Sequence, residues 1–221
     1  MTTLALIGAG PGLGTAVARR FGREGFAIAL ISRSQEHLDQ LAADLHHDHI
    51  TAHGFAADVT DAKALSTALD AATSTLGPIE VLQYSPVPHK DFMKPVQHTR
   101  PGDLQGPLAF SLFGPMTAVE QVLPDMRQAG RGTILFVNGG SAVRPHPERA
   151  GTSIAFAAES AYARMLHDSL AADGVHVAQL IIPGAIAPGD EHTDPATLAD
   201  TLWTIHQQRG DFRHYAAPLD T

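Results

Sequence analysis

The stretch LALIGAGPGLG, residues 4–14, joins a short apolar run to a loop in which four of seven positions are glycine. Gly8, Gly12 and Gly14 have the spacing G-x-x-x-G-x-G, with Gly10 as an extra glycine, and a helical segment follows. A strand that turns tightly into a helix needs residues without a Cβ for the turn, for close approach of a ligand and for helix packing. The free N–H groups and positive dipole end of such a helix bind phosphate. The pattern favours a pyrophosphate site for a dinucleotide; a tight turn without a ligand is the alternative.

Apolar runs of strand length recur along the chain, with helical segments between them. Strands that alternate with helices form right-handed βαβ units. The sequence therefore predicts an α/β fold with a doubly wound parallel sheet. The runs are LALI (4–7), FAIALI (26–31), ITAHGFAA (50–57), IEVLQY (79–84), TILFVN (133–138) and VHVAQLII (175–182).

Helical periodicity is clearest in residues 34–45 and 194–208. Ser34 and Asp194 precede the periodic apolar positions and are expected to cap these helices. Residues 104–129 predict a long, kinked helix, because its apolar spacing is helical but interrupted by Gly106, Pro107, Gly114 and Pro115. Loops at the carboxyl ends of parallel strands are where such sheets bind ligands.

Composition excludes several classes of protein. A length of 221 residues predicts a single domain over residues 1–221. The formal charge of -8 gives no support to binding of nucleic acid or of an anionic membrane. The chain has no cysteine, which excludes disulfides and thiolate catalysis. Without a basic leader or an apolar run of about 18 residues, we expect a cytoplasmic protein that does not span a membrane.

The ends of the second and third strands indicate which nucleotide binds. A site for NAD usually carries an acidic residue after the second strand, whereas Ser32 and Arg33 stand here. A guanidinium beside the ribose favours a 2′-phosphate, so NADP(H) is preferred over NAD(H). A solvated arginine is the alternative. Asp58 and Val59 follow the third strand, where a carboxylate could accept from the adenine amino group; Asp58 or Thr60 could also cap the next helix.

Taken together, these blocks resemble the short-chain dehydrogenase/reductase family. The resemblance implies a Rossmann-type sheet of about seven strands in the order 3-2-1-4-5-6-7, with the last strand near RHYAAP. It also implies a small-molecule substrate, a homodimer or homotetramer, and a nicotinamide bordered by Pro183, Gly184 and Ile186. It rests on the glycine motif at 8–14, ADVTD at 57–61, EQVLPDMRQAGRGTILFV at 120–137 and GVHVAQLIIPGAI at 174–186.

The family's chemistry depends on an Asn-Ser-Tyr-Lys set, and the resemblance places other residues at all four positions. Ser111 stands at the asparagine, Gly139 at the serine, Phe156 at the tyrosine and Ser160 at the lysine. Phenylalanine cannot donate a proton. Reduction of a carbonyl needs a donor near the developing alkoxide, so another group has to replace the tyrosine or the reaction differs.

Five residues at the expected carboxyl edge are candidates for that donor. Each serine and histidine among them is also explained as a turn or surface residue. We predict Tyr84 and Ser141 as the catalytic candidates, and the others are Ser85, His146 and Ser153. The predicted cofactor contacts are Gly8, Gly10, Gly12, Leu13, Gly14, Ser32, Arg33, Asp58, Val59, Tyr84, Pro183, Gly184 and Ile186.

Three functions remain open at this point. The first is an NADP(H)-dependent oxidoreductase of the short-chain type with a rebuilt site. The second is a dinucleotide-binding protein without redox turnover, such as a cofactor sensor or an interaction partner. The third is an isomerase or cyclase on the same scaffold. We predict no metal site, because HHDH at 46–49 lies at a helix end and has no known ligand spacing.

Overall fold

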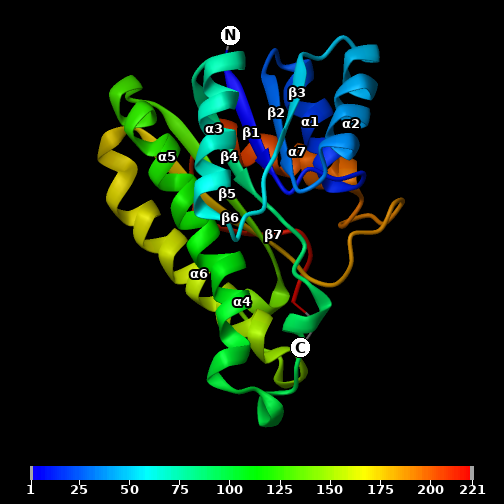
Figure 1. Cartoon of the computed structure of the whole chain (residues 1–221), viewed down its shortest axis with the longest axis vertical. Coiled ribbons are helices and arrows are strands. Elements are labelled where there is room, and N and C mark those ends of the chain that lie inside the picture. The colour runs from blue at the N-terminus through cyan, green and yellow to red at the C-terminus, as the bar shows by residue number, and fades with distance from the viewer. Residues whose placement is uncertain (1, 220–221) are drawn as a thin grey trace.

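Seven parallel strands form one sheet in the order β3-β2-β1-β4-β5-β6-β7 (Figure 1). The computed structural model describes residues 2–219. This strand order and the doubly wound arrangement confirm the predicted fold class. The strands are β1 (Thr3–Ile7), β2 (Ala27–Ser32), β3 (Ala52–Ala56), β4 (Ile79–Tyr84), β5 (Gly132–Gly139), β6 (Val175–Ile182) and β7 (Arg213–Tyr215).

Helices cover both faces of the sheet (Figure 1). The helices α1 (Leu13–Arg23), α2 (Gln35–His47) and α7 (Pro195–Gln208) pack on one face. The helices α3 (Ala62–Leu76), α5 (Gly114–Ala129) and α6 (Ala150–Leu170) pack on the other, and the short α4 (Gln105–Leu108) precedes α5. Both faces of the central strands are therefore buried, which explains why their sequences are continuous apolar runs.

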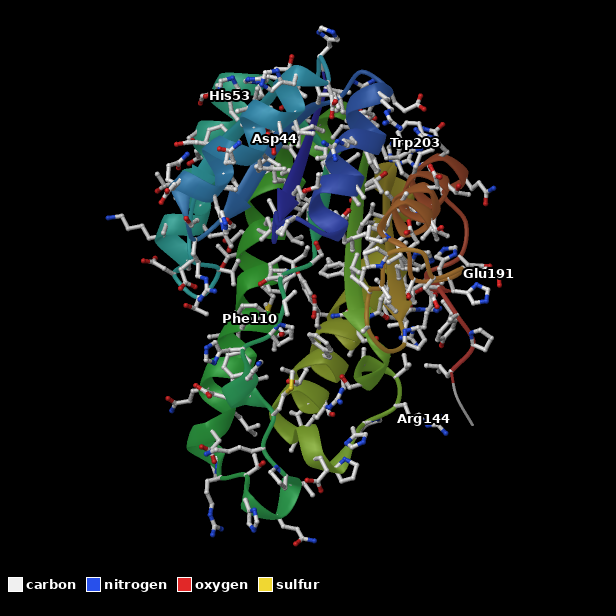
Figure 2. All side chains as sticks on the ribbon, turned by 90° about the vertical axis from the view of Figure 1, so that its right-hand side faces the viewer. Asp44, His53, Phe110, Arg144, Glu191 and Trp203 are labelled. Atoms are coloured by element: carbon white, nitrogen blue, oxygen red, sulfur yellow. The ribbon has the colours of Figure 1, made fainter. Side chains whose placement is uncertain are left out.

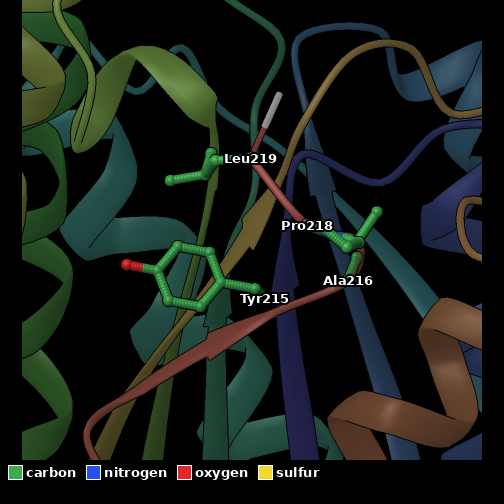
Figure 3. A pocket seen from close by; sticks show the side chains of 5 residues that line it. Tyr215, Ala216, Pro218 and Leu219 are labelled. Carbon is green, nitrogen blue, oxygen red and sulfur yellow. The ribbon is translucent and has the colours of Figure 1, made fainter. Parts of the chain in front are cut away.

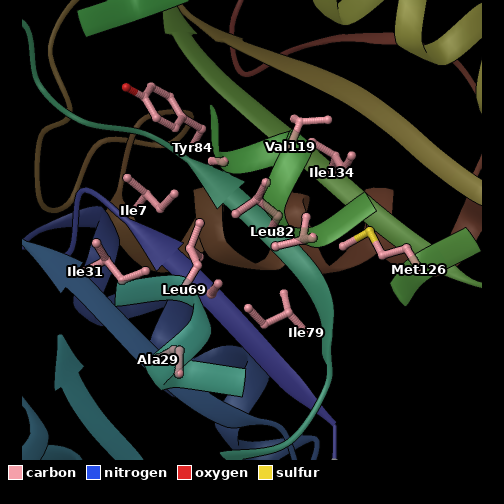
Figure 4. Close-up of a cluster of buried hydrophobic side chains, with 14 of the residues drawn as sticks. Ile7, Ala29, Ile31, Leu69, Ile79, Leu82, Tyr84, Val119, Met126 and Ile134 are labelled. Carbon is pink, nitrogen blue, oxygen red and sulfur yellow. The ribbon is translucent and has the colours of Figure 1, made fainter. Parts of the chain in front are cut away.

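The larger core lies between the sheet and α3, α5 and α6. Figure 4 shows Ile7, Ile31 and Leu82 of neighbouring strands packed with Leu69 of α3 and Val119 of α5. The strands are aligned so that Ile7 pairs with Ile31 on one side and with Tyr84 on the other. This register brings the carboxyl ends of β1, β2 and β4 to one edge of the sheet.

The long helix predicted for residues 104–129 is interrupted by a π-helical turn at Ala109–Phe113. In that turn the amide of Gly114 donates to the carbonyl of Ala109, five residues back. The next residue, Pro115, has no N–H to offer the carbonyl of Phe110. The helix ends at Gly130, whose φ of 63° is left-handed, as the glycines after residue 129 predicted.

Polar caps fix the starts of three helices. Ser34 accepts from the amide of His37 and Asp194 from the amide of Ala196, as predicted. The cap of α3 is Asp61, and Asp58 instead accepts from the amide and hydroxyl of Thr60. The prediction that Asp58 or Thr60 caps α3 was therefore wrong, because the cap is the next residue, Asp61.

Candidate active site at the carboxyl edge of the sheet

Two glycines of the loop between β1 and α1 are required by the packing of the chain itself. Gly8 has φ +96°, and a Cβ on it would lie 2.6 Å from the nitrogen of Pro86. A Cβ on Gly14 would lie 3.2 Å from the Cα of Ala9. The first contact holds the chain after β4 against the end of β1, and the second lets α1 pack on the loop. A ligand is not needed to explain either glycine.

The other two glycines have no such explanation. A Cβ on Gly10 would approach nothing closer than the carbonyl oxygen of Gly8, at 4.0 Å, and one on Gly12 would meet nothing within 4 Å. Gly12 is the N-cap of α1 and offers no side chain to the first amides of the helix, while Leu13 is buried and anchors the helix in the core. The first turn of α1 therefore has no side-chain cap, and the space beside Gly10 and Gly12 is open, as a phosphate site at a helix N-terminus requires.

The residues after β2 and β3 lie near one another beside this loop. Arg33 is exposed, and its guanidinium makes no hydrogen bond or ion pair within residues 2–219. The hydrogen bonds from Thr60, and then the charge of Arg33, hold the pKa of Asp58 below its usual value. Ser32 ends β2 half-buried, whereas the Val59 side chain is buried and its carbonyl oxygen lies against Gly114. A free cation therefore stands where the ribose phosphate was predicted.

Tyr84 lies in the core and not in the open edge of the sheet. Its hydroxyl donates to the carbonyl of Phe110, the group that Pro115 leaves without an amide donor. Figure 2 marks Phe110 on the helical segment that leads into α5. Burial, and then the charges of Glu159 and Asp58, raise the pKa of Tyr84 well above its usual value. This placement does not support the predicted catalytic and cofactor roles of Tyr84.

The residues at the positions where the resemblance expects the catalytic set provide no exposed proton donor. Gly139 ends β5, and a Cβ on it would lie 3.9 Å from the ring of Phe156 on α6. Ser111 is buried in the π-helical turn. Ser160 is also buried, and its hydroxyl donates to Gln179 of β6. An aromatic ring without a hydroxyl therefore lies near the position where the resemblance expects the catalytic serine.

A buried polar network lies below this surface. Asn138 donates to Glu159 at 2.7 Å and accepts from Gln179 at 2.8 Å. At the far end of the network, Arg213 of β7 donates to Ser160 at 2.7 Å and to Gln179 at 3.1 Å. Burial raises the pKa of Glu159 to about 8, against a smaller lowering by the Asn138 hydrogen bond. The network joins β5, α6, β6 and β7 by side chains alone.

The remaining candidates for a proton donor differ in whether their side chains already form hydrogen bonds within the protein. Ser85 accepts from Gln83 and donates to the carbonyl of Ile7, so its hydroxyl links the ends of β4 and β1. Ser153 accepts from the amide of His146, whose ring in turn accepts from the amide of Glu148.

Ser141, in the short turn after β5, is half-buried and forms no hydrogen bond within residues 2–219. The same loop continues to Arg144 at the outer surface (Figure 2). Among the five candidates for the proton donor, Ser141 has the one hydroxyl that forms no hydrogen bond with residues 2–219.

The loop after β6 completes this edge. Gly184 has φ +78°, a conformation that suits glycine, and Pro183 before it is half-buried. Ile186 leaves 39% of its surface exposed. Asp190 and Asp194 accept from amides of the same loop, which makes it compact. Pro183, Gly184 and Ile186 thus follow β6, which is separated from β4 by β5 in the sheet, and Pro183 lies near Gly140 after β5.

Sequence reasoning did not single out Glu159, Thr152 or Arg213. Oε1 of Glu159 and Oγ1 of Thr152 are buried without a hydrogen-bond partner among residues 2–219. The two residues and Phe156 follow the spacing i, i+4, i+7 and so share one face of α6. That spacing was the available signal, since polar groups on a buried helix face are uncommon.

Two absences concern the part of the chain between residues 2 and 219. No group of three or more His, Asp or Glu side chains could hold a metal ion there. The HHDH run ends α2, where His46 accepts from the amide of Ala52. No helix in the same range combines the length and the apolar character that crossing a membrane requires.

Comparison with known proteins identifies relatives of the whole arrangement. Residues 2–196 match the short chain dehydrogenase family. A D-threitol dehydrogenase of Mycolicibacterium smegmatis is 32% identical over 128 residues, which are 58% of this chain and 48% of that protein. The chain spans from 48% to 63% of the length of three curated relatives that it matches.

Solved structures share the fold. A short-chain dehydrogenase from Rhodopseudomonas palustris superimposes with a TM-score of 0.86 at 23% identity, and the match covers 98% of both chains. A metagenomic short-chain oxidoreductase in complex with NADP superimposes with a TM-score of 0.84 at 21% identity, covering 100% of this chain and 97% of that one.

Proposed function

Since the chain belongs to the short-chain dehydrogenase family, we propose that it is an NADP(H)-dependent oxidoreductase with an atypical active site. The observation that carries this proposal is the open space over Gly10 and Gly12, which the packing of the chain does not explain. A bound cofactor would supply hydride transfer to the carbonyl carbon, or from the alcohol carbon, of a small or medium substrate. The amides of the first turn of α1 would hold its phosphates.

The preference for NADP(H) rests on Arg33. Its guanidinium is exposed and without a partner among the described residues, while Ser32 offers no carboxylate for a ribose hydroxyl. A phosphate would give Arg33 charge-assisted hydrogen bonds that a hydroxyl does not. The amide and hydroxyl of Thr60 both donate to Oδ1 of Asp58. The other carboxylate oxygen, Oδ2, is therefore available to accept from the adenine amino group.

The proton chemistry has to differ from that of the family. The side chains of Phe156 and Gly139 have no ionisable proton to donate, and the Tyr84 hydroxyl donates its hydrogen bond within the core. Ser141 is free to donate a hydrogen bond to the substrate oxygen, which would orient the carbonyl and stabilise charge on it. In this proposal the proton of the product alcohol comes from water at the open edge.

The test is a titration followed by a turnover assay. NADPH and NADH are titrated into the protein while nicotinamide fluorescence is followed, and a panel of carbonyl compounds is then screened for loss of NADPH absorbance. We expect tighter binding of NADPH and slow oxidation with some carbonyls, reduced in Ser141→Ala. Absence of nucleotide binding would overturn the proposal.

A second candidate is an NADP(H)-binding protein without redox turnover. The residues Phe156 and Gly139 favour it, because the resemblance places them where the family has the tyrosine that transfers the proton and the serine that holds the substrate oxygen. NADPH binding without oxidation across the whole panel would select this candidate. Assembly into a homodimer or homotetramer, a cytoplasmic location and a single domain remain predictions that light scattering, cell fractionation and limited proteolysis would test.

A further inference from the structure

The segment after β7 returns over the edge where the proposed chemistry takes place. β7 pairs with β6, and the amide of Ala216 donates to the carbonyl of Ile181 at 2.9 Å. The hydrogen bonds of Arg213 to Ser160 and Gln179 hold the start of this strand against α6. The position of the segment is therefore set by the polar network and by strand pairing together.

Leu219 ends this path beside the candidate site. A Cβ on Gly140 would lie 3.7 Å from Cδ2 of Leu219 and 3.8 Å from the Cα of Pro183. Leu219 also packs against an apolar cluster that is separate from the two large cores, and the other members of this cluster are Ala142, Val143, Phe156 and Ile181. The ring that replaces the family's tyrosine is thus continuous with the side chain of Leu219.

A hollow of about 420 Å³ is lined by Tyr215, Ala216, Ala217, Pro218 and Leu219. Figure 3 shows the Tyr215 ring and the Leu219 side chain projecting to the same side of the segment, with Ala216 and Pro218 on the other. None of the five lining side chains is charged. The volume is within the range of small-molecule sites, about 300 to 1,000 Å³.

We propose that this hollow binds the aliphatic part of a ketone or aldehyde substrate, and that Leu219 is a specificity-determining residue. The assignment rests on the proposed oxidoreductase function, since it names the substrate class of the same site. Three observations support it: the apolar lining, the continuity of Leu219 with Phe156, and the contact with Gly140 one residue before the free hydroxyl of Ser141. A charged substrate would find no counter-ion among the five lining side chains, and their one polar group is the hydroxyl of Tyr215.

Burial of apolar surface predicts how affinity depends on chain length. Each methylene that enters an apolar site contributes about 0.8 kcal/mol, which is about a fourfold gain in affinity. Methyl ketones from 2-butanone to 2-octanone should therefore bind with increasing affinity until the hollow is filled. Dihydroxyacetone should bind more weakly than 2-pentanone.

The experiment measures ketone binding by calorimetry with the whole protein, both alone and saturated with NADP⁺. NADP⁺ cannot reduce the ketone, so this measurement does not depend on turnover. Leu219→Asp places a charge in the hollow, and Ala217→Trp fills it. Each variant should remove the dependence of ketone affinity on chain length. Met165→Asp is the matched control for Leu219→Asp, because Met165 is exposed on α6 and does not line the hollow.

The outcomes separate this inference from the proposed function. A chain-length dependence in the wild type that is lost in both Leu219→Asp and Ala217→Trp, with NADPH affinity unchanged, supports the subsite. The same dependence in the wild type and in Ala217→Trp, with both proteins folded by circular dichroism, overturns it. If ketones bind with this dependence but no nucleotide binds, the subsite stands and the oxidoreductase assignment fails.

Discussion

The side-chain amide of Asn138 donates a 2.7 Å hydrogen bond to Oε2 of Glu159, a carboxyl group that is 1% exposed. Asn138 directly precedes Gly139, and Glu159 directly precedes Ser160, two positions at which the resemblance expects catalytic residues. Oε1 of Glu159 has no partner within residues 2–219. A buried ionisable group is therefore held next to the candidate site in the sequence of both β5 and α6.

The first prediction concerns the pH dependence of stability. Burial raises the pKa of Glu159 from 4.5 to about 8. Between these values the folded protein binds more protons than the unfolded chain, so stability falls as pH rises through this window. Glu159→Gln removes this loss and should be more stable than the wild type at pH 9, by on the order of 3 kcal/mol. Urea unfolding at pH 5, 7 and 9 checks it; parallel pH profiles of the two proteins would contradict it.

A second pH effect has the opposite sign and lies at the other end of the sheet. Burial, and then the positive charges around His176, lower its pKa from 6.5 to about 4. The unfolded chain binds more protons between these values, so stability falls as pH drops from 6.5 towards 4. His176→Gln should lose less stability than the wild type over this range. Thermal unfolding at pH 7 and pH 5 compares the two, with the exposed His37→Gln as a control.

The glycines of the loop should separate into two classes. Gly8→Ala forces a Cβ to within 2.6 Å of Pro86 at φ +96° and should destabilise the fold by at least about 2 kcal/mol. Gly10→Ala meets no atom closer than 4.0 Å, so its stability should stay within about 0.5 kcal/mol of the wild type. We expect its NADPH affinity to fall nonetheless, because the methyl group enters the phosphate space. Unfolding and fluorescence titrations of both variants test this; unchanged NADPH affinity in Gly10→Ala would remove the main support for cofactor binding.

Arg33→Ala tests nucleotide preference. Loss of a charge-assisted contact with the 2′-phosphate should weaken NADPH binding by about tenfold or more and leave NADH binding unchanged. Arg131→Ala is the control, because Arg131 is an exposed arginine just before β5, at the opposite edge of the sheet. If Arg33→Ala still prefers NADPH to the same degree, another group reads the phosphate.

Tyr84→Phe distinguishes a structural from a catalytic role. The variant leaves the carbonyl of Phe110 without a donor, which should cost about 1 to 3 kcal/mol of stability. NADPH affinity and any rate of NADPH oxidation should be unchanged. Chemical unfolding and steady-state kinetics measure the two effects. Full stability with abolished turnover would restore Tyr84 as a catalytic residue.

The sequence was sufficient for the order of the elements, and it also predicted the edge of the sheet at which we propose that a ligand binds. Apolar runs, helix caps such as Ser34 and Asp194, and the glycine loop are patterns of residues close together in the chain, and their periodicity reports local backbone geometry. The strand order followed from the family resemblance, and the structure confirms it.

Tertiary structure alone decided what individual side chains do. Tyr84 lies at the carboxyl end of β4, as its place in the sequence predicts. Its hydroxyl donates to the carbonyl of Phe110, which Pro115, 31 residues after Tyr84, leaves without an amide donor. Pro86 leaves no room for a Cβ on Gly8, and Leu219 lies beside Gly140, although each pair is separated by about 80 residues in the chain. Such pairs lie far apart in the chain and have no periodicity, because their contact depends on how the strands align and how the helices pack on them.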